Sequence, residues 1–228
     1  MMTKDIVLTP ERAAIIGKTA IISDLHIGIE NVLQERGVAI PRIQIDEIIR
    51  NVKNLIDKYH VNRLVIAGDF KHEFSKNLPY ELEDIKRFIE SIDVEISVVR
   101  GNHDNFLAGV LKEYGIELKE YIRIGGYYVV HGHKEVNFER VIMGHEHPAV
   151  KVRVRGGVYT YPCFLIADNR VVVLPAFSPL ASGNNILQGF ISPMLKNAKR
   201  VDVFGVSDNE VLYLGCVEDL KAVIQSIL

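Results

Sequence analysis

Apolar runs alternate with amphipathic segments through the first half of the chain. Uniformly apolar runs are typical of strands that are buried on both faces of a sheet. We assign three such strands to 20–24, 64–69 and 95–100. Pro41–Tyr59 and Tyr80–Ile92 instead carry apolar residues at helical spacing. This alternation of strand and helix predicts a parallel sheet with crossover helices.

The second half of the chain is richer in short strands. Asp168-Asn169 and Gly156-Gly157 have the composition of hairpin turns and separate some of these strands. The predicted strands are Tyr127–His131, Arg140–Met143, Val150–Val154, Val158–Tyr161, Phe164–Ala167, Val171–Leu174, Val201–Val206 and Glu210–Leu214.

Helices and one long loop complete the predicted architecture. We expect a short helix over 105–114 and a final helix over 217–228. The loop over 177–197 is rich in Gly, Asn, Ser and Pro, and is either a rim over a site or a mobile connection. The whole pattern predicts an α/β fold in a single domain, residues 1–228, with two stacked mixed β-sheets flanked by helices.

Composition and charge exclude few partners. The chain has 228 residues, of which 48% are hydrophobic and 25% charged, and its net charge is −2. There is no global basic excess for nucleic-acid binding, although a local basic groove is compatible with this total. Candidates for such a groove, which are otherwise plain solvated charges, are Arg42, Arg50, Arg63, Arg87 and Arg100. The sparse cysteines, and the lack of a recognisable membrane span or signal peptide, lead us to expect a cytoplasmic protein.

Polar side chains follow each predicted strand of the first half. Asp24 and His26 come after the first strand, and residues two apart point to the same side of an extended chain. Asp69 follows the second strand and Asn102 follows the third. Because ligand sites in parallel α/β sheets lie beyond the carboxyl ends of the strands, we expect these side chains to meet.

Histidines follow strands of the second half in the same way. His131 and His133 follow one strand, and His145 and His147 follow another. Carboxylate, imidazole and amide ligands suit Mn, Fe, Zn and similar ions, and one aspartate can bridge two of them. Most of these motifs, taken alone, have another explanation as a turn, a cap or surface histidines, and Gly-His-Glu-His alone is a moderate signal for a metal. All five motifs in this order, each at a predicted strand end, predict a metal site.

The order of these motifs resembles the calcineurin-like metallophosphoesterase superfamily. The motifs are Asp24-x-His26, Gly68-Asp69, Gly101-Asn102-His103-Asp104, His131 and Gly144-His145-x-His147. The resemblance implies an α/β/β/α sandwich and two divalent metal ions, with Mn expected first and Fe, Zn, Ni or Mg as alternatives. It implies that the ligands of one ion are Asp24, His26, Asp69 and His147. It implies that the ligands of the other ion are Asp69, Asn102, His131 and His145, so that Asp69 is the bridge.

One ligand position is ambiguous, because His131 and His133 both offer an imidazole. We favour His131, which directly ends its apolar strand, and His133 then supports the site or lies at the surface. The first motif also departs slightly from the superfamily pattern, in which Gly often precedes the aspartate that here follows Ser23.

The resemblance also implies roles beyond metal binding. His103 is expected to face the substrate and to protonate the leaving oxygen as a general acid. Asp104 either orients that imidazole or caps the helix predicted near Asn105. His72, just past the bridging aspartate, either contacts the phosphate or is a surface loop histidine.

A looser resemblance narrows the expected substrate. It is to the phosphoesterases associated with DNA ligases or helicases and their archaeal relatives, and it implies a role in DNA repair. The residues that carry it are Ser23–Gly28, Arg36, Gly37, Pro41, His72, Gly144–Val150, Cys163, Phe164 and Leu174–Phe177.

The expected activity is phosphodiester hydrolysis by a hydroxide that bridges the two ions, because water between two cations ionises near neutral pH. Nucleic acid is a candidate substrate. A phosphomonoesterase or a small-nucleotide phosphodiesterase is the alternative, and a non-enzymatic binding module is disfavoured because every ligand position is kept. We expect a phosphate ester as the partner, no membrane, and either a monomer or a homodimer.

Overall fold

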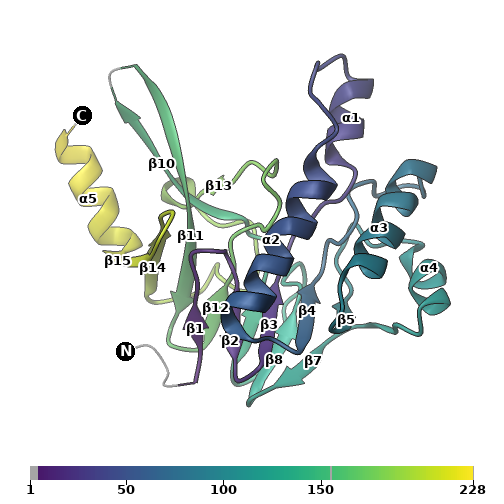
Figure 1. Cartoon of the computed structure of the whole chain (residues 1–228). Coiled ribbons are helices and arrows are strands. Elements are labelled where there is room, and N and C mark those ends of the chain that lie inside the picture. Colours follow the sequence, from purple (N-terminus) through teal and green to yellow (C-terminus); the bar gives the residue numbers. More distant parts are fainter. Residues whose placement is uncertain (1–4, 155, 228) are drawn as a thin grey trace.

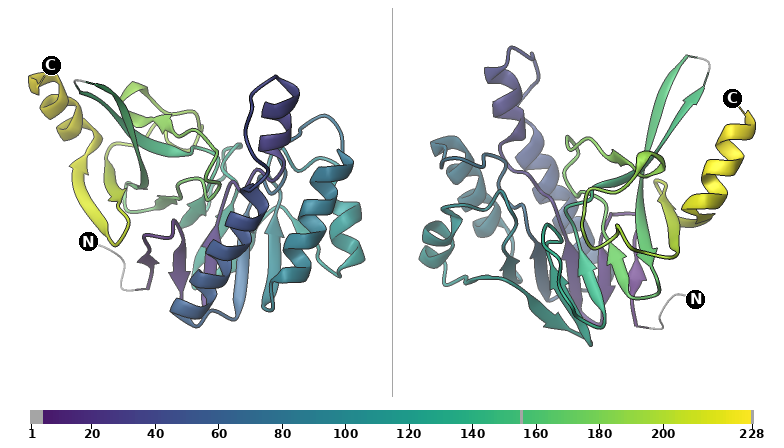
Figure 2. Two further views of the ribbon diagram at one scale, coloured as in Figure 1. Left: turned by 45° about the horizontal axis from the view of Figure 1, so that its top comes forward. Right: turned by 180° about the vertical axis from the view of Figure 1, so that it is seen from behind.

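Two β-sheets pack against each other, and helices cover the outer face of the first sheet (Figures 1 and 2). The computed structural model describes residues 5–154 and 156–227. The arrangement confirms the predicted α/β class with two stacked mixed sheets flanked by helices. No helix in the described part of the chain is both long enough and apolar enough to cross a membrane.

The first sheet runs in the order β1-β2-β3-β4-β5-β6. Strands β3 to β6 are parallel, and β1 and β2 extend one edge in antiparallel fashion. The apolar pattern did not predict β1, β2 and β6, which have only two or three residues each. The strands are β1 (Val7–Leu8), β2 (Ala14–Ile16), β3 (Thr19–Ile22), β4 (Arg63–Ala67), β5 (Glu95–Val99) and β6 (Leu118–Lys119).

Four helices connect or follow the strands of this sheet. They are α1 (Ile29–Glu35), α2 (Gln44–Tyr59), α3 (Pro79–Ser91) and α4 (Leu107–Glu113). The prediction for α2 started too early, at Pro41, because the residues between 41 and 43 form a bend before the helix begins. The sequence pattern missed α1, which is short.

Both faces of the first sheet are buried, as the apolar runs predicted. Ile22 and Leu64 pack with the helices in one core cluster. Their neighbours Ile21 and Val65 belong to another cluster that contains Ile142 of the second sheet. Alternate residues of each strand therefore serve two cores, and the carboxyl ends of β3, β4 and β5 are held rigidly between them.

The second sheet has the order β13-β10-β11-β12-β9-β8-β7, with β14 paired to β11 and β15 paired to β14. Strand β9 is parallel to β8 and β12, whereas most other pairs are antiparallel. Helix α5 (Val217–Ile227) follows β15 directly. The strands are β7 (Ile122–Ile124), β8 (Tyr127–Val130), β9 (Val141–Met143), β10 (Pro148–Val154), β11 (Gly157–Ala167), β12 (Val171–Val173), β13 (Asn184–Asn185), β14 (Val201–Val206) and β15 (Val211–Cys216).

Strand β11 corrects one prediction, because it is continuous where two strands were expected. Pro162 lies inside it and pairs with Ala149 of β10, whereas the pairing with β14 begins only at Cys163. One edge of β11 is therefore unpaired at the proline, and a strand tolerates proline at such a position. The predicted turn at Asp168-Asn169 is confirmed, with both residues in the left-handed region. At the other predicted turn Gly157 already belongs to β11, and residue 155 lies outside the described residues.

Candidate metal centre

The predicted ligands converge where β3, β4, β5, β8 and β9 end. Asp24 and His26 follow β3, and Asp69 follows β4. Backbone hydrogen bonds from Asp24 N to Gly68 O (3.1 Å) and from His26 N to Asp69 O (3.0 Å) join these two loops. The parallel pairing of β3 with β4 therefore continues beyond the strands and brings the two motifs together.

Five of the seven candidate ligands have left-handed backbone conformations. Their φ angles are 56° for Asp24, 44° for His26, 50° for Asp69, 67° for His145 and 46° for His147. Such conformations cost roughly 1–3 kcal/mol each in residues other than glycine and persist where the surrounding structure enforces them. The backbone is therefore not extended at Asp24, His26, His145 and His147, in contrast to the extended chain that the two-apart spacing suggested.

One group of possible ligands consists of Asp24, His26 and His147, whose ligand atoms lie within 4.8 Å of one another. His147 Nε2 is 3.2 Å from Asp24 Oδ1 and 3.2 Å from His26 Nε2. Asp69 Oδ2 is 3.7 Å from His26 Nε2. These donors have the chemistry and the spacing that suit a divalent transition metal.

A second group consists of Asp69, His131 and His145, again within 4.8 Å. His131 Nε2 is 3.3 Å from Asp69 Oδ2 and 3.0 Å from Asn102 Oδ1. Asp69 thus lies against both groups, which is the place of a bridging carboxylate in a two-metal site. The structure brings together all seven residues that the sequence proposed as ligands.

The geometry distinguishes His131 from His133. His131 is buried, and its Nδ1 lies 3.0 Å from the carbonyl oxygen of Ala67, so that this nitrogen donates and Nε2 points into the site. A fixed hydrogen bond on the other ring nitrogen is usual for a metal-binding histidine. His133 is only half-buried, and its Nδ1 has no hydrogen-bond partner among the described residues.

Burial shapes the electrostatics of the site. It lowers the pKa of His26 to about 3 and that of His145 to about 4, so both imidazoles are neutral and able to bind a cation. Burial acts against charge on Asp69 as well, but its hydrogen bond with His131 and the surrounding imidazoles hold the pKa of Asp69 below its usual value. Burial likewise opposes a proton on His131, yet the hydrogen bond to Asp69 and the charge of that carboxylate raise the pKa of His131 to about 9. A proton on His131 thus offsets the negative charge of the buried carboxylates, and a bound cation can take over this role.

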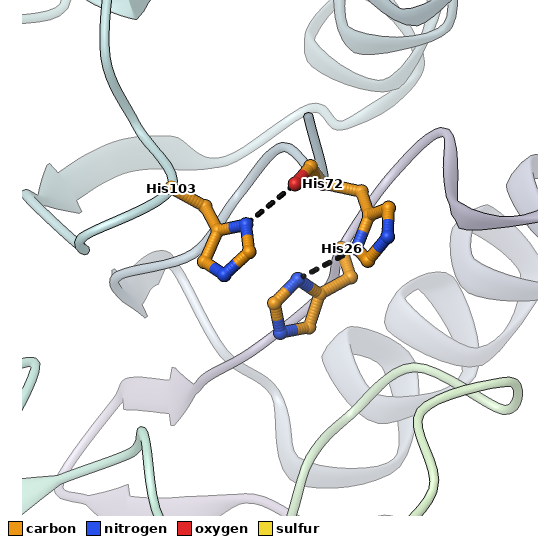
Figure 3. A group of neighbouring side chains, drawn as sticks. All are labelled: His26, His72 and His103. Carbon is orange, nitrogen blue, oxygen red and sulfur yellow. Dashed lines mark hydrogen bonds between the residues drawn. The ribbon is translucent and has the colours of Figure 1, made fainter. Parts of the chain in front are cut away.

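His103 and His72 form a third cluster with His26 (Figure 3). His103 Nδ1 contacts the carbonyl oxygen of His72, and His72 Nδ1 lies 3.3 Å from His26 Nδ1. The side chain of His103 keeps 28% of its surface exposed, and its Nε2 is 4.0 Å from Asp69 Oδ2. One ring nitrogen is therefore fixed by a carbonyl, while the other faces the metal centre and solvent.

Asp104 corrects both interpretations that the sequence allowed. Its buried carboxylate accepts hydrogen bonds from three backbone amides, those of Gly101 (2.7 Å), Phe70 (2.8 Å) and Lys71 (3.3 Å). The carbonyl of His72, rather than Asp104, holds the His103 ring, and α4 begins only at Leu107 without a side-chain cap. Asp104 instead ties the loop after β5 to the loop after β4.

The sequence profile of the calcineurin-like phosphoesterases matches residues 17–185. The chain belongs to this family. It is therefore a hydrolase of phosphoric esters, in a family that uses divalent metal ions. No curated protein matches the chain by sequence.

One solved structure agrees with this family assignment at the level of the fold. The Pseudomonas putida nuclease MPE superimposes with a TM-score of 0.68 at 22% identity, covering 92% of this chain and 94% of that chain. The Escherichia coli phosphoesterase Yfce gives a TM-score of 0.43 at 17% identity, covering 85% of this chain and 95% of that chain.

The loop over 177–197 lies at the rim of this phosphoesterase site. Ser182, Gly183, Asn184 and Ile191 line the same open cavity as the metal-site histidines. Of the two interpretations that the sequence left open, this contact favours the rim.

Sequence reasoning missed the residue that fastens the rim. Glu146, between His145 and His147, is buried, and its carboxylate accepts hydrogen bonds from Asn184 Nδ2 (2.6 Å), Ile191 N (3.0 Å) and Ser192 N (2.7 Å). Its place in the Gly-His-Glu-His motif was a signal, but the partners are almost 40 residues or more away in sequence, so the motif alone did not name them.

Gln44 was missed for a similar reason. From the start of α2 its buried amide nitrogen donates to the carbonyls of Leu25 (3.2 Å) and His26 (2.9 Å), and its oxygen accepts from Gly28 N (3.2 Å). The loop that carries His26 is thereby fixed to α2. In the sequence Gln44 is an ordinary polar residue of an amphipathic helix.

Proposed function

We propose that this phosphoesterase is a metal-dependent phosphodiesterase that acts on nucleic acid, with a role in DNA repair. The observation that carries the proposal is the pair of ligand groups, with Asp69 in one and 3.7 Å from His26 of the other, beneath the partly exposed His103. The open cavity above them favours a phosphate within a long chain over a small molecule that must be enclosed. The nuclease activity named for the similar Pseudomonas putida protein supports this choice.

Asp24, His26, Asp69 and His147 are the proposed ligands of one ion, and Asp69, Asn102, His131 and His145 those of the other. Two divalent ions held by these residues, Mn²⁺ being our expectation, would lower the pKa of bound water and offset negative charge on phosphoryl oxygens. The backbone amide of His103 donates to Asp69 Oδ1 at 2.9 Å and holds that carboxylate in its shared position.

His103 is the proposed general acid. Its Nδ1 faces the His72 carbonyl, which leaves Nε2 to carry the proton toward the oxygen that leaves phosphorus. His72 lies beside His103 with the two rings stacked, at a centroid distance of 5.7 Å. We propose two roles for His72. Its ring packs against the ring of His103 and holds it in place, and it forms part of the wall against which the phosphate lies.

The test compares hydrolysis of bis-p-nitrophenyl phosphate with that of p-nitrophenyl phosphate, with Mn²⁺ and with a chelator. We expect diester cleavage that requires metal and is abolished in Asp69→Asn. His60→Asn is the matched control, because His60 ends α2 with a left-handed backbone that asparagine tolerates. Preference for the monoester would replace the proposal by a phosphomonoesterase, and a folded protein inactive with every divalent metal would refute it.

A further inference from the structure

A second depression opens from the metal site toward the β10–β11 hairpin. The metal-site cavity and this depression share His147, Ser182 and Gly183 in their walls. Beyond these residues the depression is lined by Lys151 of β10 and Thr160 of β11. A ligand that leaves the metal centre on this side therefore reaches the hairpin.

The hairpin projects from the body of the protein (Figures 1 and 2). Residues directly opposite each other on paired strands point to the same face. Lys151 opposes Thr160, and Arg153 opposes Val158, so these four side chains share the face that continues the depression. Val152 and Tyr159 form the pair between them and point to the other face.

The face is positively charged through Lys151 and Arg153. In the described part of the chain neither Lys151 nor Arg153 forms an ion pair, and no acidic residue lines the depression. Four of the five arginines that the sequence offered for a basic groove are instead bound to carboxylates. They are Arg42 with Asp84, Arg63 with Glu95, Arg87 with Asp46 and Arg100 with Glu120.

We propose that this hairpin face binds the phosphodiester backbone of a nucleic-acid strand as the strand leaves the metal centre. The inference rests on the proposed function and adds the path of the substrate. From Pro148, next to His147, to Arg153 the extended strand β10 spans about 17 Å at roughly 3.4 Å per residue. Lys151 and Arg153 stand about 7 Å apart on it. A mononucleotide does not reach both cations and the metals, whereas a strand of several nucleotides does.

The chemistry of the face indicates that it reads the backbone rather than the bases. The three opposed pairs on it, from Ala149 with Pro162 to Arg153 with Val158, offer charge and a hydroxyl but no aromatic ring for stacking. Contacts to phosphate position a nucleic acid without selecting its sequence. Binding is therefore expected to depend on salt and to be independent of sequence.

The test measures binding of a fluorescent 20-nucleotide DNA by anisotropy at several salt concentrations. It is made with Mn²⁺ in a His103→Ala background, which slows cleavage. Each phosphate contact on a single strand contributes about 0.7 to the slope of log K against log salt, so Lys151→Gln with Arg153→Gln is expected to lower the slope by about 1.4. The control is Lys53→Gln with Lys112→Gln, which removes the same charge from exposed positions on α2 and α4. With His103 intact, hydrolysis of bis-p-nitrophenyl phosphate is expected to be unchanged in the hairpin variant.

Two results would overturn the inference. One is an unchanged slope in a hairpin variant whose melting temperature matches the parent. The other is an equal fall in the control variant, which would mean that total charge and not the hairpin governs binding. Failure of the proposed function looks different, because the parent enzyme would then leave the diester intact while the slope still falls in the hairpin variant.

Discussion

The buried carboxylate of Glu146 provides the sharpest test of how the rim is held. In Glu146→Ala the amides of Ile191 and Ser192 and the side chain of Asn184 lose their common acceptor. The Ser192 amide is buried, so leaving it without a partner costs about 2 kcal/mol. The donors of Ile191 and Asn184 lie nearer the surface and can turn to water, which adds about 1 kcal/mol.

The expected loss of unfolding free energy is therefore about 3 kcal/mol, with a fall in melting temperature of about 6–12 °C for a chain of this length. Glu146→Gln keeps one acceptor oxygen but turns an NH₂ group toward an amide donor, so about half of the loss is expected. Because Asn184 and Ile191 line the metal-site cavity, KM for the diester is expected to rise more than kcat falls.

Urea unfolding monitored by circular dichroism, together with steady-state kinetics, measures both effects. Glu135→Ala is the matched control, since this glutamate is exposed and its side chain makes no hydrogen bond or ion pair among the described residues. If Glu146→Ala were within 1 kcal/mol of Glu135→Ala, the carboxylate would not be the anchor of the rim.

Three further predictions concern groups in and beneath the site. Lys71→Met leaves the buried Glu81, whose Oε2 lies 3.6 Å from the lysine Nζ, without its cation, and a loss of about 3–5 kcal/mol in urea unfolding is expected. Recovery of part of that loss in Lys71→Met with Glu81→Gln would identify the pair as its source, and no recovery would contradict it. Asp104→Asn is expected to lower stability by about 1–3 kcal/mol and to reduce kcat equally for good and poor leaving groups, because it positions loops. A larger effect on poor leaving groups would show that Asp104 takes part in proton transfer. His131→Gln is expected to lower bound metal, measured by mass spectrometry, from two ions to about one per chain. His133→Gln is expected to leave it unchanged, and the opposite result would exchange their roles.

Much of the fold was predictable because buried strands and amphipathic helices have clear apolar patterns. The runs ending at Asp24 and Asp69 are strands of a parallel sheet, so placing both residues at one edge required no knowledge of side-chain contacts. The prediction missed the short strands because it depends on such patterns, and two or three residues show no period. The prediction divided β11 near Pro162, where one edge of the strand is unpaired. The sequence pattern does not show this, because the unpaired edge depends on where β14 ends.

The supporting contacts were not predictable, because they join residues remote in sequence. Gln44 reaches Ser178 at 3.0 Å across 134 positions, and Glu146 reaches Ser192 across 46. Asp104 has a helix-capping residue type and a neighbouring histidine, yet two of the three amides that it accepts from belong to another loop. The residue type of Asp104 does not distinguish a helix cap from a contact between loops, because the carboxylate binds the unpaired backbone amides that lie nearest in space.

These contacts bear on how the enzyme selects its substrate. Left-handed conformations at five candidate ligands cost roughly 1–3 kcal/mol each, and they persist only because the surroundings fix them. Gln44, Asp104 and Glu146 are such surroundings, since each binds the backbone of a loop that carries or overlies the ligands. A site held in this way presents the same geometry to any phosphoric ester. Discrimination among esters must then come from what lies outside the ligand shell, which here is the rim and the basic face of the β10–β11 hairpin.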